Sequence, residues 1–459
     1  MIADNKIFAR ILLWLGYFGL LLLASLPHGM RTELTPHYPC ATQLVQPGST
    51  CEPKALRPTA TNEDIIHVMH GADAAFIAAR AKDIVQQRDW THISVWPLWP
   101  PGMVALQTLL YWISPHVPVA LILVMINCAV WAMVCTQLAH IMMKDGRQRL
   151  LAGIFPLLML LSGCFDYLLH FGVFFSESFS IAFFLLGIGT LFLSVQDKDL
   201  VHAGIAGICF ALSAYMRAQT DIIMTLILAL MVVYVVWDGL HAKAFSLQRL
   251  RALPWLAVTA AAMFFYHIVT FPYRIFHHMH WISFSDNPSW YYIWEKKENL
   301  PPAYQFYIQG GGLAGCDVDA ELCNAIHARA AAGKGIFTFT DYFWFTLQSF
   351  LHHPFAWLVF KIAHLRDFWL DQMPGSLVIT ILLPVVLFYS AKKRDDRHTI
   401  LGLFLCMTVA GIIGPLLLMH VELRYLYQLK CLILYSAIIV IGLQLMPHAL
   451  PPVQSNNSR

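Results

Sequence analysis

Apolar stretches long enough to cross a lipid bilayer recur along the chain and constrain its fold more than any other feature. A transmembrane helix needs about 20 predominantly apolar residues. About ten such stretches lie near residues 7–26, 117–139, 150–169, 176–195, 201–216, 219–237, 252–271, 376–391, 399–419 and 426–446. Hydrophobic residues make up 58% of the chain and charged residues only 12%, unlike a soluble domain. The sequence therefore predicts an all-α polytopic membrane protein with no strand pattern that would add a soluble domain.

Two long polar stretches divide this series of spans. Residues 1–26 are predicted to be a retained N-terminal anchor, because their apolar run is long and no small-residue cleavage site follows it. The expected organisation is then a first loop at 27–116, spans two to seven within 117–272, a second loop at 273–375, spans eight to ten within 376–446 and a polar cytoplasmic tail at 447–459.

Basic residues gather in the short connections on one side of this topology. With ten spans and the N-terminus inside, the basic residues of these connections are Lys144, Arg147, Arg149, Lys198, Lys243, Arg249, Arg251, Lys392, Lys393, Arg394 and Arg397. Short basic connections lie in the cytoplasm by the positive-inside rule. Both long loops are therefore predicted to face outward. The net charge of +3 is too small and too dispersed to favour a nucleic-acid partner.

Four of the ten cysteines lie in the two long loops, and the others lie in apolar runs. The spacings from Cys40 to Cys51 and from Cys316 to Cys323 each suggest a short disulfide loop. Disulfides persist in oxidising compartments, so this pairing agrees with outward-facing loops. The alternative is two pairs of free thiols that happen to be near each other in sequence.

Charged residues interrupt the apolar runs at the predicted outer ends of several spans. They are Asp166, Glu177, Arg217, Asp221, Glu422 and Arg424. Ionisable groups at membrane depth usually face an aqueous cavity or a partner. Together they predict one outward-facing site. For each residue the alternative is an interfacial side chain that snorkels to water.

The first loop changes character at Thr61, where Thr-Asn-Glu-Asp resembles a capping box that opens a helix. Apolar residues then recur at helical spacing, which is typical of a helix lying in the membrane interface. Asp73 lies near the edge of the apolar stripe, and His70 precedes it by one turn. Asp73 could point toward the span ends, or it could be a solvated residue.

Short motifs recur in the outer loops and at the outer span ends. They lie at 71–73 with 78–81, at 99–102 (Trp-Pro-Pro-Gly), at 175–178, at 214–217, at 353–354 with the aromatic run through 369, and at 422–426. In order and topology they resemble the GT-C glycosyltransferases, in particular the branch that includes the protein O-mannosyltransferases and the lipid A aminoarabinose transferase. That branch often has Asp-Glu in its first-loop motif, whereas Ala74 follows Asp73 here.

This resemblance implies an enzyme that transfers a sugar from a polyprenyl phosphate to an acceptor on the outer side of the membrane, with inversion. Asp73 is the candidate base for the acceptor hydroxyl. Arg217 and Arg424 are the candidate ligands of the donor phosphate, since guanidinium groups bind phosphate in bidentate fashion. Glu177 is a second catalytic candidate. Glu177 and Glu422 are expected to orient the arginines or the acceptor, and His70 is a supporting residue.

Some members of the family hold a divalent metal at this phosphate. His277, His278 and His280 are candidate ligands, since histidine clusters can bind zinc and related ions. Three histidines so close together can equally be an interfacial feature, and a carboxylate-held metal at Asp73 and Glu177 is the other option. No glycine-rich phosphate loop after a strand is present, which favours a lipid-linked donor over a nucleotide sugar.

Two other classes of protein remain open. A secondary transporter also has about ten spans and membrane-embedded charges, but it typically shows internal repeats, which are absent from this sequence. A noncatalytic subunit that scaffolds an envelope assembly is the third option. The expected partners are a polyprenyl-phosphate sugar, membrane lipid and an envelope lipid, glycan or protein acceptor. The expected location is a bacterial inner membrane with the site facing the periplasm; the endoplasmic reticulum would give the same orientation.

Overall fold

The fold is helical throughout the part of the chain described in the computed structural model. These residues are 2–29, 72–88, 101–113, 119–144, 148–161, 168–169, 176–217, 219–241, 253–276, 347–348, 350–366, 369–370, 375–393, 396–418 and 423–445. No strand occurs among them. The predicted all-α class is therefore confirmed for these residues.

Helices occupy all ten predicted apolar stretches. They are α1 (Ile2–Gly29), α5 (Val119–Lys144), α6 (Arg149–Ile154) with η1 (Phe155–Leu157) and α7 (Leu158–Leu161), α9 (Glu177–Asp197), α10 (Leu200–Met216), α11 (Gln219–His241), α12 (Leu253–Phe276), α19 (Ser376–Lys393), α20 (Asp396–Leu418) and α21 (Leu423–Leu445). The stretch predicted at 150–169 begins as two short α-helices joined by a 3₁₀ turn. Pro156 lies in that turn and lacks the N–H that a regular helix requires.

Five of the described helices are long and apolar enough to cross a membrane by length and composition. These segments are Ile7–Ser25, Leu121–Lys144, Glu177–Asp197, Asp396–Gly414 and Leu426–Gln444. The chain is therefore an integral membrane protein of the expected helical class. The further spans that would bring the number to ten remain a prediction.

Helix α9 lies at the centre of the bundle and is buried on all sides along most of its length. A helix that is hydrophobic all round packs inside a protein in this way. Phe184 of α9, Phe210 of α10 and Phe404 of α20 pack together in the core, with 5.2 Å between the stacked rings of Phe210 and Phe404. This aromatic cluster joins the consecutive helices α9 and α10 to α20, which is distant from them in sequence.

Side-chain contacts define the direction of each helix relative to α9. Helix α5 runs parallel to α9, as shown by contacts of Asn127 with Ser178, Gln137 with Thr190 and Lys144 with Asp197. Helix α20 runs antiparallel to α9, because the rings of His398 and Phe404 contact those of Phe192 and Phe184 respectively. The end of α10 and the starts of α9, α11 and α21 therefore lie at one end of the bundle.

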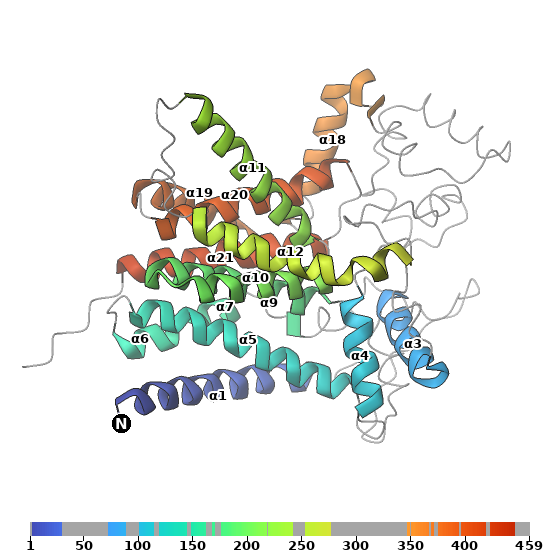
Figure 1. The fold of residues 1–459 in the computed structure, drawn as a ribbon, viewed down its shortest axis with the longest axis vertical. Helices are drawn as coiled ribbons and strands as arrows, with labels where there is room; N and C mark the ends of the chain where they lie inside the picture. The colour runs from blue at the N-terminus through green and yellow to red at the C-terminus, as the bar shows by residue number, and fades with distance from the viewer. Residues whose placement is uncertain are drawn as a thin grey trace, which may run out of the picture.

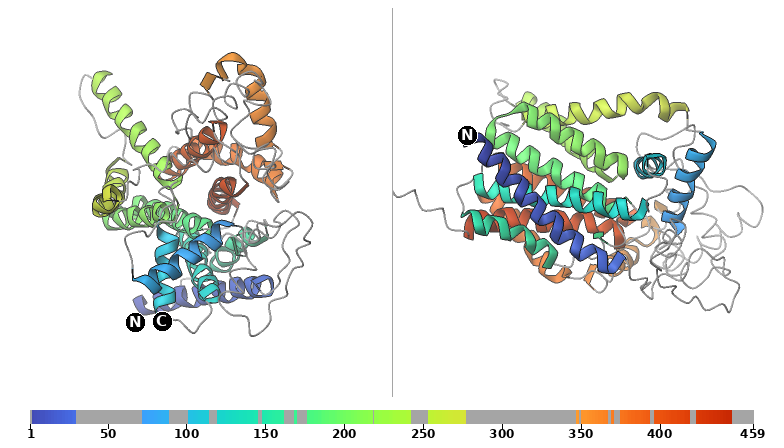
Figure 2. Two further views of the ribbon diagram at one scale, coloured as in Figure 1. Left: turned by 90° about the vertical axis from the view of Figure 1, so that its right-hand side faces the viewer. Right: turned by 90° about the horizontal axis from the view of Figure 1, so that it is seen from below.

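Two further helices lie across this same end. Helix α4 (Gly102–Ile113) stands across the ends of the long helices, and α3 (Ala72–Gln87) packs beside it (Figure 1). Seen from below, the long helices run lengthwise while α4 is viewed nearly end-on (Figure 2). The first loop thus places two helices against this end of the bundle, and their interfacial position stays a prediction. In the second loop, the structure describes α18 (Pro354–Arg366).

Candidate functional site

A buried ion pair joins the adjacent ends of α9 and α10. Nη1 of Arg217 donates a hydrogen bond to Oε1 of Glu177 at 2.5 Å. The Glu177 side chain is 1% exposed and that of Arg217 is 17% exposed. Both residues were predicted at outer span ends, and the structure brings them into direct contact.

The backbone at these helix ends departs from the helical conformation. Ser176 caps α9 with φ 72° and ψ −14°, a left-handed conformation that strains a non-glycine residue. Arg217 follows α10 in an extended conformation, and its N–H donates to the carbonyl oxygen of Ser213 at 2.8 Å. Strain of the kind seen at Ser176 concentrates at functional sites. Glu177 also lies in the first turn of α9, where the helix dipole favours a carboxylate.

A buried ion pair is weak evidence for stability, so this pair is a candidate functional feature. A buried ion pair often contributes no more stability than apolar residues of similar volume, because both charges lose their hydration. Ionisable residues inside a membrane protein commonly mark substrate or ion sites. A guanidinium has five N–H donors in a planar fork, so one that a carboxylate holds in place can also bind phosphate oxygens.

A hydrogen-bonded chain of side chains anchors the start of α9 to α5. Ser178 Oγ donates to Oδ1 of Asn127 at 2.7 Å and accepts from Nε1 of Trp131 at 2.8 Å. Nδ2 of Asn127 donates in turn to the carbonyl oxygen of Leu168 at 3.2 Å. Asn127, Trp131 and Ser178 are each completely buried. Ser178, the residue next to Glu177, is therefore held by buried hydrogen bonds to both Asn127 and Trp131.

Three hydroxyl groups connect α9, α10 and α11 near the ion pair. Ser180 Oγ donates to the carbonyl oxygen of Ser213 at 3.0 Å, and Ser213 Oγ donates to the carbonyl oxygen of Ser180 at 2.7 Å. The hydroxyl oxygen of Ser213 also lies 2.6 Å from that of Thr220. We call Ser180, Ser213 and Thr220 the hydroxyl cluster. It links the three helix ends that surround Glu177 and Arg217.

Gly102 brings the first-loop helices into contact with this site. A Cβ atom at Gly102 would lie 2.5 Å from the carbonyl oxygen of Tyr215 and 2.8 Å from its carbonyl carbon. Only glycine allows two backbones to approach so closely. Gly102 opens α4, and Tyr215 lies two residues before Arg217. The Trp-Pro-Pro-Gly motif therefore ends directly against the end of α10.

Three more of the predicted residues belong to helices that begin near this site or pack beside it. Asp73 is the second residue of α3, and α3 packs on α4. Arg424 is the second residue of α21, which begins at the same end of the bundle as α9. Asp221 lies in the first turn of α11 and is 6% exposed. The structure describes the backbone at Asp73 and Arg424, and their side-chain roles remain predictions.

The other predicted residues lie outside the described part of the chain. They are His70, Asp166, Glu422, the candidate metal ligands His277, His278 and His280, and the four loop cysteines Cys40, Cys51, Cys316 and Cys323. The predicted disulfides and histidine cluster therefore remain predictions. Among the described residues, no group of three or more His, Cys, Asp or Glu side chains could hold a metal ion.

Sequence analysis did not single out two buried polar residues of α21. Lys430 is fully buried, and its Nζ lies 5.4 Å from the centre of the Tyr427 ring. Gln428 is 1% exposed, and within the described residues neither its Oε1 nor its Nε2 has a hydrogen-bond partner. Lys430 falls within the predicted span at 426–446. A charged residue inside an otherwise apolar run is the signal that could have identified it as a candidate. The hydroxyl cluster had no such signal, because serine and threonine are common in membrane helices.

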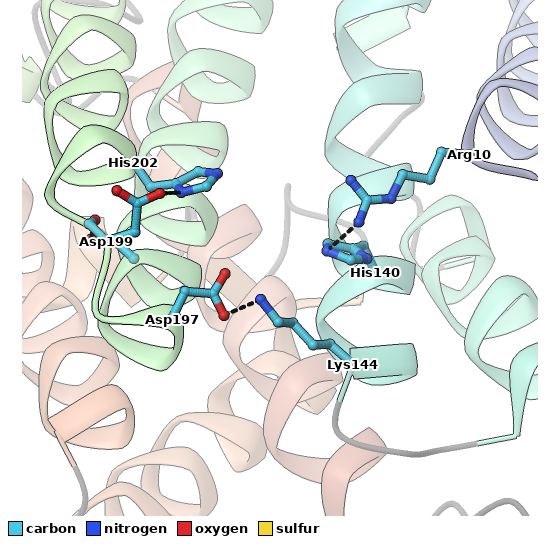
Figure 3. Close-up of polar contacts among 7 residues, drawn as sticks. Arg10, His140, Lys144, Asp197, Asp199 and His202 are labelled. Atoms are coloured by element: carbon cyan, nitrogen blue, oxygen red, sulfur yellow. Dashed lines mark hydrogen bonds and ion pairs between the residues drawn. The ribbon is translucent and has the colours of Figure 1, made fainter. Parts of the chain in front are cut away.

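A separate group of charged residues lies at the opposite end of the bundle (Figure 3). Its contacts are Arg10 with His140, Lys144 with Asp197, and Asp199 with His202. Hydrogen bonds from the N–H of Val201 and from His202 lower the pKa of Asp199, which caps α10. These partly exposed contacts join α1 to α5 and α5 to α9 at the predicted cytoplasmic end, while Asp199 and His202 pair at the start of α10. Exposed ion pairs of this type contribute little stability individually.

Solved structures that resemble this chain include two oligosaccharyltransferase structures of Archaeoglobus fulgidus. No family model and no curated protein matches the chain. One solved structure is an oligosaccharyltransferase of Archaeoglobus fulgidus in complex with zinc and sulfate, with 13% identity, a TM-score of 0.44 and coverage of 91% of this chain and 48% of that protein. The other is the oligosaccharyltransferase AglB of Archaeoglobus fulgidus with an inhibitory peptide and a dolichol-phosphate, with 12% identity, a TM-score of 0.45 and coverage of 92% and 50%.

The chain spans about half the length of these two proteins. Likenesses at this identity and TM-score assign neither a family nor an activity to the chain.

Proposed function

We propose that the protein is an integral membrane glycosyltransferase that transfers a sugar from a polyprenyl-phosphate donor to an envelope lipid, glycan or protein on the outer face of the membrane. The observation that carries this proposal is the buried Glu177–Arg217 pair at the bundle end that α4 covers. The motifs at 71–81, 99–102 and 422–426, with their resemblance to GT-C glycosyltransferases, add support. A bacterial inner membrane with a periplasmic site is the proposed setting.

The proposed reaction is a single displacement at the anomeric carbon. The acceptor hydroxyl oxygen forms a bond to that carbon while the bond from the carbon to the donor phosphate oxygen breaks. The hydroxyl proton passes to the carboxylate of Asp73, and the electron pair leaves on the polyprenyl phosphate. This geometry inverts the configuration of the sugar.

Charge stabilisation of the leaving phosphate is the main task left to the protein, since a phosphate needs no proton to depart. Arg217 would bind the phosphate oxygens in a position that Glu177 maintains. Arg424 at the start of α21 is proposed as the second phosphate ligand. Preorganised charges aimed at developing negative charge are usually the largest single contribution to catalysis.

The test is sugar transfer by the purified protein in lipid nanodiscs. A radiolabelled sugar is supplied on polyprenyl phosphate with a membrane extract as the source of acceptor, and the wild type is compared with Asp73→Asn. Asp83→Asn is the matched control, because Asp83 lies on the same helix and the substitution is identical. Transfer by the wild type and by Asp83→Asn, with none by Asp73→Asn, supports the proposal and the base.

Two results would count against it. Wild-type turnover in Asp73→Asn would remove Asp73 as the base. Absence of transfer from every donor by folded wild-type protein would overturn the enzyme proposal in favour of a transporter or a scaffold subunit.

A further inference from the structure

The hydroxyl cluster lies directly behind the ion pair on the same interface between α9 and α10. Ser180 follows Glu177 by three residues and Ser213 precedes Arg217 by four. Residues three and four positions apart lie on one face of a helix. The ion pair and the two serines are therefore neighbouring contacts between the same two helices. All three hydroxyl-bearing residues of the cluster are at most 1% exposed.

Ser213 combines two contacts that bear on Arg217. Its carbonyl oxygen accepts the N–H of Arg217 at 2.8 Å and the hydroxyl of Ser180 at 3.0 Å. The backbone that leads into Arg217 is therefore attached to α9 through a side chain of α9. This contact limits how far the end of α10 can move relative to Glu177.

The side chain of Ser213 restrains the same segment from the other direction. Its hydroxyl contacts that of Thr220, which lies beyond Arg217 at the start of α11. Ser213 and Thr220 thus connect the chain before Arg217 with the chain after it. The turn that carries Arg217 is closed by one hydrogen bond between buried hydroxyls, where a competing water molecule has little access.

We propose that Ser213, together with Ser180 and Thr220, is a positioning residue that holds the Arg217 guanidinium against Glu177 and toward the donor phosphate. This inference rests on the proposed function for its catalytic consequence. Its structural content, the dependence of the Glu177–Arg217 contact on the hydroxyl cluster, can be measured without any substrate. Small displacements of a charged group cost large factors in rate, on the order of 100-fold for about 1 Å.

The test compares Ser213→Ala with the matched control Thr259→Val. Thr259 is also completely buried, and its hydroxyl donates to the carbonyl oxygen of Ala203 at 3.0 Å, near the opposite end of α10. Each variant therefore removes one buried hydroxyl that joins α10 to a neighbouring helix. Alanine is also the better helix former, so a loss in Ser213→Ala reflects missing contacts and not helix propensity.

The first readout is a double-mutant cycle on Glu177 and Arg217. The single variants Glu177→Met and Arg217→Met and their combination are made in the wild type, in Ser213→Ala and in Thr259→Val. The coupling between the two sites is then obtained from the midpoints of thermal unfolding in nanodiscs. We expect the coupling in Ser213→Ala to fall below about half of its wild-type value, and that in Thr259→Val to stay unchanged. Equal coupling in all three backgrounds, or an equal loss in both variants, would overturn the proposal.

The second readout is sugar transfer. Ser213→Ala is expected to lower kcat at least about tenfold with a smaller change in KM for the donor, and Ser213→Thr, which keeps a hydroxyl, is expected to recover most of it. Thr259→Val should transfer at the wild-type rate. Wild-type kcat in Ser213→Ala would contradict the positioning role. If the wild type transfers no sugar, the proposed function fails. The double-mutant cycle still tests whether Ser213 positions Arg217, because it needs no substrate.

Discussion

Oε1 of Glu177 and Nη1 of Arg217 lie 2.5 Å apart, although 40 positions separate the two residues in the chain. They meet because α9 and α10 are antiparallel neighbours, so the first residue of one lies beside the residue that follows the other. The hydroxyl cluster and the Ser178–Asn127 contact lie beside the pair. The pair thus has a fixed place at the end of the bundle, with Glu177 fully buried and Arg217 partly buried.

Removing one member of this pair should destabilise the protein more than removing both. Glu177→Met removes the carboxylate that Arg217 contacts, and breaking a buried pair in this way costs about 3–5 kcal/mol. The double variant Glu177→Met with Arg217→Met should recover most of that loss, since apolar residues of similar volume fill the same space. Unfolding midpoints in nanodiscs measure both effects. Transfer should stay absent in the double variant, and a Glu177→Met protein as stable as the wild type would contradict the role of the pair.

A methyl group at Gly102 should separate α4 from the end of α10. The Cβ of Gly102→Ala would meet the backbone of Tyr215 at 2.5 Å, and backbone cannot rotate out of the way as a side chain can. We expect transfer to fall more than about tenfold from the displacement of the first-loop helices. Gly204→Ala is the control, because nothing lies within 4 Å of its Cβ position. That variant should be active and more stable by about 0.5–1 kcal/mol; equal activity in both variants would show that α4 does not position the site.

The cap at the predicted cytoplasmic end should make stability depend on pH in a defined direction. The hydrogen bond from the N–H of Val201 is the largest single cause that lowers the Asp199 pKa in the folded state, and His202 lowers this pKa further. The charged carboxylate therefore adds stability that is fully present above its ordinary pKa of 3.8 and is lost as the pH falls through the lowered folded-state value. Asp199→Asn keeps a capping oxygen but does not titrate.

The difference in unfolding midpoint between the wild type and Asp199→Asn should thus be largest near neutral pH and shrink in acid. A difference that stays constant from neutral to acidic pH would rule out this contribution of Asp199.

Thiol counting should test the predicted disulfides in the outer loops. If Cys40 pairs with Cys51 and Cys316 with Cys323, six of the ten cysteines should react with an alkylating agent in denatured, unreduced protein. Five of those six are the free cysteines of the described helices, Cys128, Cys135, Cys209, Cys406 and Cys431. Reduction should raise the count to ten, as read by intact mass. Ten reactive thiols before reduction would remove both disulfides and the support that they lend to the orientation.

Much of the helical architecture follows from local properties of the sequence. Hydropathy over about 20 residues located the apolar helices, because burial of a whole helix in lipid or protein demands apolar residues along its length. The interruption at Pro156 was not predicted, although proline was a visible signal. Glu177 and Arg217 were predicted as charges at span ends. Lys430, which lies deeper in its span and is fully buried, was not predicted.

The positions of the helices and the charges at their ends follow from local sequence, since both depend on residues that are neighbours in the chain. Three contacts follow from the packing of the helices and not from local sequence: Glu177 with Arg217, Gly102 with Tyr215, and the cluster of Ser180, Ser213 and Thr220. These contacts depend on which helices pack together and at what register. That arrangement is set by the shapes of many side chains at once, as in the packing of Phe184, Phe210 and Phe404, and no single motif encodes it.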